Sequence, residues 1–181
     1  MFELEYFIFL VPNLFFLYYW ITRSNPTLKY LATVGLAFYV AFYSKNDILI
    51  TTIQFTLFSL GDLVLETGTL NQSLVLFGLG KIVKMLKYRA YTSIIISLTY
   101  SLFIYKQTRR LIYGYVFLHL LHFYVIYHYA NIWHIISNVF FILSDILIGL
   151  DIIGYRLPNY EYISYPLYWC SNLCSIVSSR F

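Results

Sequence analysis

The stretch ILITTIQFTLFSLGDLVL, residues 48–65, decides the fold of this chain. Its apolar side chains run almost without interruption over roughly the 17–25 residues that a helix needs to cross a bilayer. A strand in a membrane barrel would instead alternate apolar and polar side chains. In lipid every backbone polar group must be bonded within the protein, which favours a helix for a continuous apolar stretch. Residues 48–65 therefore predict a membrane-spanning helix that carries one acidic side chain, Asp62.

Similar apolar stretches recur along the rest of the chain and predict a bundle of about eight membrane helices. Charged residues, Gly, Pro or Asn separate them, for instance at residues 23–26, 44–47, 106–110 and 154–159. Connections this short force neighbouring helices to run antiparallel and leave no room for a soluble domain. We therefore expect one all-α, polytopic domain over residues 1–181, with helices at about 4–22, 28–43, 48–65, 70–86, 91–105, 111–128, 131–150 and 162–178.

The composition supports a membrane environment. Hydrophobic residues make up 60% of the chain and charged residues only 11%, whereas soluble domains are about one quarter charged. The 12 Lys and Arg residues divide evenly between the two predicted faces, so they predict no orientation and no nucleic-acid partner. Glu3 and Glu5 at the amino end argue against a cleaved signal peptide. An integral, multi-pass protein of the endoplasmic reticulum or of a bacterial inner membrane fits, with the oligomeric state left open.

Two aspartates inside the predicted helices are the first candidates for function. Asp62 shares a helix face with Ser59, and Asp145 lies close to the face that carries His134 and Asn138. Charges within the membrane are costly and by default indicate function. We expect these polar faces to meet across a shared cavity. The structural alternative is that each aspartate only bonds a carbonyl or a Tyr hydroxyl of a neighbouring helix.

Basic residues raise two further questions. His119 and His122 lie one turn apart, but their spacing matches no specific zinc motif, so we predict no metal site. Lys81 and Lys84 lie three residues apart near the end of one predicted helix. We expect Lys84 to extend its amine to the membrane surface. For Lys81 the surface and the cavity both remain open.

Two segments resemble the signature motifs of the YhhN-like lysoplasmalogenase family. FTLFSLGDLVL, residues 55–65, is similar to that family's FSLxGDxxL, and VFFILSDILI, residues 139–148, is similar to its GAxxFxxSDxxLA. Order and separation agree, and a helix with Tyr and Ser side chains follows over residues 165–178. The chain departs from the family pattern at Asn25, Lys81, Lys84 and Asn138.

The resemblance implies an enzyme that hydrolyses the vinyl ether bond of lysoplasmalogens taken from the bilayer. The products are a fatty aldehyde and glycerophosphoethanolamine or glycerophosphocholine. Such a reaction needs one protonated carboxyl group, expected to be Asp145, and one carboxylate that stabilises the oxocarbenium ion, expected to be Asp62. It requires no metal or organic cofactor. Side chains expected to bind water or substrate, with a lysine for the lipid phosphate, are Ser59, Ser144, Asn138, Tyr168 and Lys81.

Two other classes of function fit the same sequence. A small lipid or proton-coupled transporter would use the aspartates for ion coupling, although the two halves of the chain show no inverted repeat. A family member without activity would keep the fold as a membrane scaffold. An enzyme needs both aspartates close to one reacting bond, a transporter needs a second opening, and a scaffold needs neither.

Overall fold

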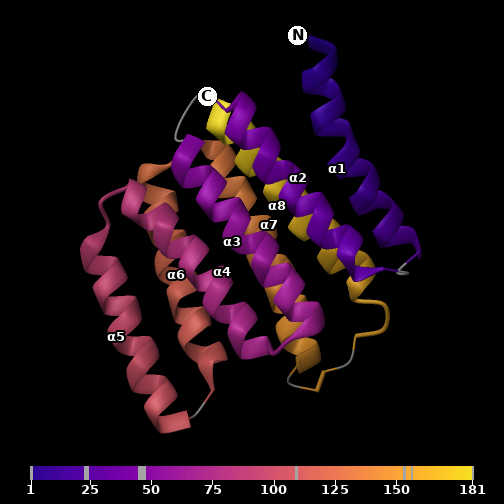
Figure 1. Ribbon diagram of the computed structural model, residues 1–181. Helices are drawn as coiled ribbons and strands as arrows, with labels where there is room; N and C mark the ends of the chain where they lie inside the picture. The colour runs from indigo at the N-terminus through magenta and orange to yellow at the C-terminus, as the bar shows by residue number, and fades with distance from the viewer. Residues whose placement is uncertain are drawn as a thin grey trace.

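A computed structural model describes residues 2–22, 25–44, 48–108, 110–152, 154–155 and 157–180. Over these residues the chain forms eight α-helices and no strand (Figure 1). The helices are α1 (Phe2–Thr22), α2 (Pro26–Tyr43), α3 (Ile48–Thr67), α4 (Leu70–Lys87), α5 (Tyr91–Thr108), α6 (Leu111–Tyr129), α7 (Ile132–Ile152) and α8 (Glu161–Arg180).

The helix boundaries confirm the prediction of an all-α bundle, because each end lies within 3 residues of its expected position. Local signals account for several ends. The Asn25 side chain accepts a hydrogen bond from the Thr27 amide at 2.9 Å and caps α2. Arg89, with φ of 54°, ends the turn after α4 and lets α5 begin at once. The predicted breaks at 23–26, 44–47, 106–110 and 154–159 lie partly outside the described residues.

The helices pack mainly against their neighbours in sequence. α1 contacts α2, α2 contacts α3, α3 contacts α4, α5 contacts α6, and α7 contacts α8. Contacts of α6 with α4 and with α7 join these pairs, as does a smaller contact of α1 with α8. α1 and α5 lie at opposite flanks, with the other six helices between them (Figure 1). The two aspartate-bearing helices, α3 and α7, are both among these inner helices.

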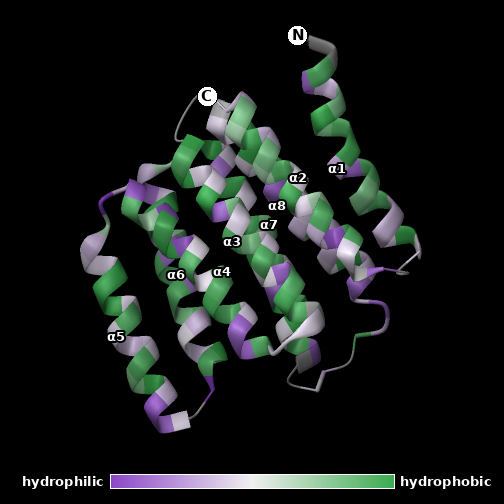
Figure 2. Ribbon diagram, viewed as in Figure 1, coloured by the Kyte–Doolittle hydropathy of each residue, from purple (hydrophilic) through white to green (hydrophobic). Residues whose placement is uncertain are grey.

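The outer surface is apolar and indicates a membrane protein. Four stretches are long and apolar enough to cross a membrane, namely Leu4–Thr22, Ile48–Leu65, Leu111–Tyr129 and Ile132–Asp151. Apolar side chains dominate the outer helices (Figure 2). The large apolar side chain of Phe42, for example, is 71% exposed. Soluble monomers rarely expose contiguous apolar surface on this scale.

The interior is polar by comparison. Buried residues include three lysines, three histidines, Asp62 and many serines. Close helix approach leaves little space around them. A Cβ atom at Gly80 on α4 would lie 2.5 Å from the Phe58 ring of α3, so glycine is required for this packing. Gly80 therefore permits the close approach of α4 to α3.

Candidate functional site

Asp62 lies on α3 in a fully satisfied ion pair. Its Oδ1 is 3.0 Å from the Nζ of Lys29 on α2, and the two side chains are only 2% and 4% exposed. Its Oδ2 accepts hydrogen bonds from the hydroxyls of Thr33 at 3.0 Å and Tyr168 at 2.8 Å. Three helices, α2, α3 and α8, therefore meet at this carboxylate. Both oxygens have partners, which is the environment of a fixed, ionised group.

Asp145 lies on α7 and has a less symmetrical environment. Its Oδ2 accepts a hydrogen bond from the Tyr115 hydroxyl at 2.8 Å and lies 3.1 Å from Nδ1 of His119, both on α6. The other oxygen, Oδ1, has no hydrogen-bond partner among the described residues. The side chain is 25% exposed. Asp145 is therefore held through one oxygen and accessible through the other.

The two aspartate groups lie on either side of a common aromatic cluster. The cluster is built from Phe58, Phe77, Phe141 and Tyr168, with Tyr115 packed against it. The Phe141 ring is 5.5 Å from the Tyr168 ring, which bonds Asp62, and 5.6 Å from the His119 ring, which contacts Asp145. Within the described part of the chain no hydrogen bond joins the two carboxylates directly.

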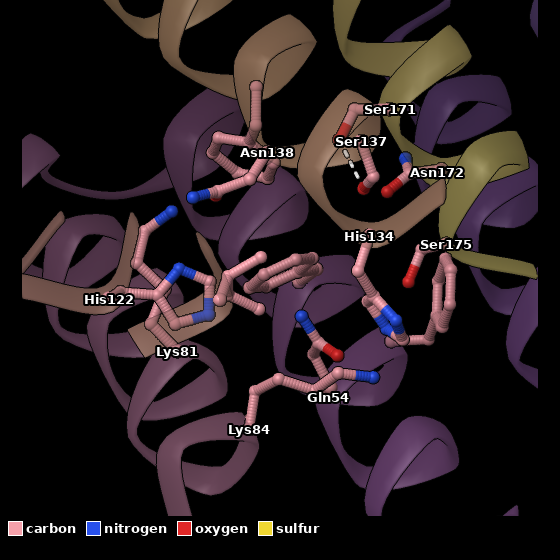
Figure 3. A pocket seen from close by; sticks show the side chains of 14 residues that line it. Gln54, Lys81, Lys84, His122, His134, Ser137, Asn138, Ser171, Asn172 and Ser175 are labelled. Carbon is pink, nitrogen blue, oxygen red and sulfur yellow. Dashed lines mark hydrogen bonds between the residues drawn. The ribbon is translucent and has the colours of Figure 1, made fainter. Parts of the chain in front are cut away.

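A small cavity, here called the basic cavity, lies beside this cluster between α3, α4, α6, α7 and α8 (Figure 3). Its volume is about 20 Å³, and one water molecule needs roughly 10–15 Å³ by the same measure. The residues that line it are Gln54, Phe55, Phe58, Lys81, Lys84, His122, Ile126, His134, Ser137, Asn138, Phe141, Ser171, Asn172 and Ser175. Neither Asp62 nor Asp145 is among them. The basic cavity is therefore distinct from the cavity that we expected the two aspartates to share.

The other predicted site residues divide between the aspartate groups and the cavity. Tyr168 bonds Asp62, and Lys81 lies 3.4 Å from Nε2 of His119 while also lining the basic cavity. Asn138 lines the cavity. Ser144 donates to the carbonyl of Ser164 and joins α7 to α8. Ser59 donates to the carbonyl of Phe55 within its own helix, so both hydroxyls donate to backbone carbonyls rather than to an aspartate.

One expectation about the lysines was wrong. Lys84 does not extend to the surface but is 1% exposed and lines the basic cavity. Contacts of α4 with α3 and with α6 enclose the Lys84 side chain. Lys81, which the sequence left open, is likewise 1% exposed.

The aspartate partners Lys29, Thr33 and Tyr115 were not predicted from the sequence. Lys29 stands near the start of α2, where a lysine is usually taken to reach the membrane surface. Tyr115 is one of 20 tyrosines, and nothing in its neighbours distinguishes it. A search for polar residues facing Asp62 and Asp145 on other helices would have needed the tertiary contacts.

Among the described residues no group of three or more His, Cys, Asp and Glu side chains is placed to hold a metal ion. His119 instead lies between Asp145 and Lys81. The ring of His122 is 6.5 Å from that of His119, and His122 faces the basic cavity.

Comparisons with known proteins identify no family for this chain. No family model matches the chain, and no match was found among curated proteins or among solved structures.

Proposed function

We propose that this protein is a membrane-embedded hydrolase that cleaves the vinyl ether bond of lysoplasmalogens. The observation that carries the proposal is the difference between the two carboxyl groups. Both oxygens of Asp62 are occupied by Lys29, Thr33 and Tyr168. Asp145 has one oxygen without a partner and a partly exposed side chain. The resemblance of the two aspartate-bearing segments to the lysoplasmalogenase motifs points to the same reaction.

The reaction needs a proton donor and a source of negative charge, and the two groups suit these tasks. Asp145 in its acid form gives its proton to the β-carbon of the vinyl ether, and the ether oxygen then shares positive charge with the adjacent carbon. Water adds to that carbon, and its released proton returns to Asp145. The hemiacetal breaks to the aldehyde and the free glycerol hydroxyl. In this proposal Asp62 remains an anion, and its charge acts on the cationic intermediate across the aromatic cluster that separates it from Asp145, whereas the second carboxylate of a glycosidase flanks the scissile bond directly.

His119 and Tyr115 assist Asp145 in this proposal. After proton transfer the Asp145 carboxylate keeps the Tyr115 hydroxyl at 2.8 Å and His119 at 3.1 Å. Donors placed at the atom where charge develops lower the barrier because they need no reorganisation. Both groups bind Oδ2, so Oδ1 is left to approach the substrate.

A lipid substrate fits a protein of this architecture. In the proposal all eight helices cross the membrane, including those shorter or more polar than the four that are long and apolar enough by themselves. The partly exposed Asp145 is then reached sideways from the bilayer by a single-chain lipid. The protein then lies in the membrane that contains its substrate, which is either the endoplasmic reticulum or a bacterial inner membrane.

A second candidate is a scaffold without catalytic activity, and one observation favours it. Asp62 is bonded through both oxygens to three neighbouring side chains, which is also what a purely structural ion pair between α2, α3 and α8 requires. This candidate assigns no task to the unpartnered Oδ1 of Asp145. Activity measurements separate the two.

The test is aldehyde release from lysoplasmalogens with ethanolamine or choline head groups by the purified protein in nanodiscs. In D₂O the proposed mechanism places one deuterium on carbon 2 of the aldehyde, which mass spectrometry detects. Asp145→Asn should reduce the rate by about 10²–10⁴-fold, the usual contribution of a general acid. Asp62→Asn should also lose activity, while Asp151→Asn on the same helix as Asp145 serves as the matched control.

The outcomes of this test distinguish the hydrolase from the scaffold. Deuterated aldehyde that disappears in both site variants, but not in Asp151→Asn, supports the hydrolase. Thermal unfolding of every variant in detergent shows whether the fold is retained. No release from the unmodified protein with either head group refutes the hydrolase and favours the scaffold.

A further inference from the structure

The basic cavity has the charge of an anion site. Two lysines and two histidines line it, namely Lys81, Lys84, His122 and His134, and no Asp or Glu is among its described lining residues. Most of the remaining polar side chains carry amide or hydroxyl donors. Lysine amines and N–H groups around one buried space favour an anion at its centre, because attraction between opposite charges is strong in a medium of low dielectric constant.

Several polar atoms of the cavity lining, most of them nitrogens, have no hydrogen-bond partner in the described chain. Neither ring nitrogen of His122 has a hydrogen-bond partner among the described residues, and the same holds for Nε2 of His134 and Nδ2 of Asn138. These residues are only 4–5% exposed. Figure 3 shows His122 and His134 on opposite sides of the cavity, with Asn138 above them. Buried polar groups are nearly always bonded in folded proteins, so several unbonded nitrogens around one cavity indicate a ligand.

The position of the cavity relates it to the proposed chemistry. Lys81 lines the cavity, and its Nζ is 3.4 Å from Nε2 of His119. The opposite nitrogen of that ring, Nδ1, is 3.1 Å from Asp145. One imidazole ring therefore separates the basic cavity from the proposed acid. In a lysophospholipid a similarly short linkage, the three glycerol carbons and one oxygen, separates the ether oxygen from the phosphorus.

The geometry points to the basic cavity as the subsite for the phosphate group of the single-chain lipid, an inference that rests on the proposed hydrolase. With room for about one to two water-sized groups, the cavity accepts the unesterified phosphate oxygens and leaves the ethanolamine or choline outside. Lys81 and Lys84 supply the charge, while His122 and Asn138 supply N–H donors. A phosphate oxyanion is the shared chemistry of a lipid head group and of free phosphate, and the experiment separates these two sources.

Binding is measured with three probes on purified protein in an uncharged maltoside detergent. The first is a 1-alkyl-glycerophosphoethanolamine, whose saturated ether is not cleaved. The second is the 1-alkylglycerol of the same chain length, and the third is inorganic phosphate. The rise of the thermal unfolding temperature with ligand concentration gives each apparent affinity. The binding measurement does not require hydrolysis. A protein that lacks the proposed activity can therefore be distinguished from a protein that lacks the phosphate subsite.

The subsite predicts that the phospholipid binds about ten- to hundredfold more tightly than the alkylglycerol, the range for hydrogen bonds to a charged group. Lys84→Gln should remove most of this difference, whereas Lys87→Gln, three residues further along α4 and outside the cavity lining, should retain it. His122→Asn is the second variant if Lys84→Gln fails to fold.

Three outcomes would overturn the inference. Equal affinity of the unmodified protein for the two lipids would show that the phosphate is not recognised. A difference that persists in both Lys84→Gln and His122→Asn would place phosphate recognition elsewhere. Stabilisation by inorganic phosphate, without any gain from the lipid phosphate, would assign the cavity to a free anion rather than to the substrate.

Discussion

Replacing Lys29 by Met tests whether the Asp62 ion pair holds three helices together. The amine and the carboxylate are 3.0 Å apart, and their side chains are 4% and 2% exposed. The substitution leaves Asp62 with only the hydroxyls of Thr33 and Tyr168 as partners. A carboxylate buried without its cation is costly, and breaking one side of such a pair destabilises a protein by about 3–5 kcal/mol. We expect a loss of that size in the free energy of unfolding.

The double variant Lys29→Met, Asp62→Asn separates a lost ion pair from lost packing. With both charges removed no uncompensated charge remains, so the double variant should recover most of the loss although it lacks the proposed activity. The measurement is equilibrium unfolding in mixed micelles with increasing denaturing detergent. Lys106→Met, at an exposed lysine of α5, is the matched control. The reasoning is refuted if Lys29→Met costs less than about 1 kcal/mol, as exposed pairs do, or if the double variant is no more stable than Lys29→Met.

Two other substitutions test the packing and the proposed acid. Gly80→Ala places a Cβ 2.5 Å from the buried Phe58 ring and should cost about 1–3 kcal/mol by overpacking. Gly149→Ala, with nothing within 4 Å of its Cβ, should be neutral or stabilising by up to about 1 kcal/mol in the same unfolding assay. Tyr115→Phe removes the donor at 2.8 Å from Asp145 and should slow aldehyde release roughly tenfold or more without loss of fold. An unchanged rate would remove Tyr115 from the proposed mechanism.

The helices could be predicted from the sequence because their signals are local. Continuous apolar residues between polar breaks gave every helix of the described chain to within 3 residues at each end. Even α8, which contains many serines and Pro166, was predicted as the last of these apolar stretches, over residues 162–178. Such signals depend only on residues close together in the chain, which is why tertiary packing did not change them.

The partners of the aspartates could not be predicted, because they come from other helices. Lys29 and Asp62 are 33 positions apart in the sequence, and no periodicity relates the two. The exposure of Lys84 could not be predicted either, because it depends on neighbouring helices. Its position near a helix end predicted exposure, but the contact of α4 with α3 and α6 encloses its amine. Helix-end rules apply to single helices in lipid and fail where a neighbour covers the end.

The arrangement of charge favours a reaction on an amphiphile over a purely structural use of the polar groups. A scaffold needs each buried charge to be neutralised by a partner, as Lys29 neutralises Asp62. The polar lining of the basic cavity departs from this rule, since neither ring nitrogen of His122 has a hydrogen-bond partner among the described residues. Asp145 departs from the rule too, because one of its oxygens has no partner in the described chain. Lys81 and His119 connect these two exceptions. A substrate that carries an anionic phosphate close to an acid-labile ether complements the basic cavity and Asp145 at the same time. A ligand that is only an anion would complement the cavity alone.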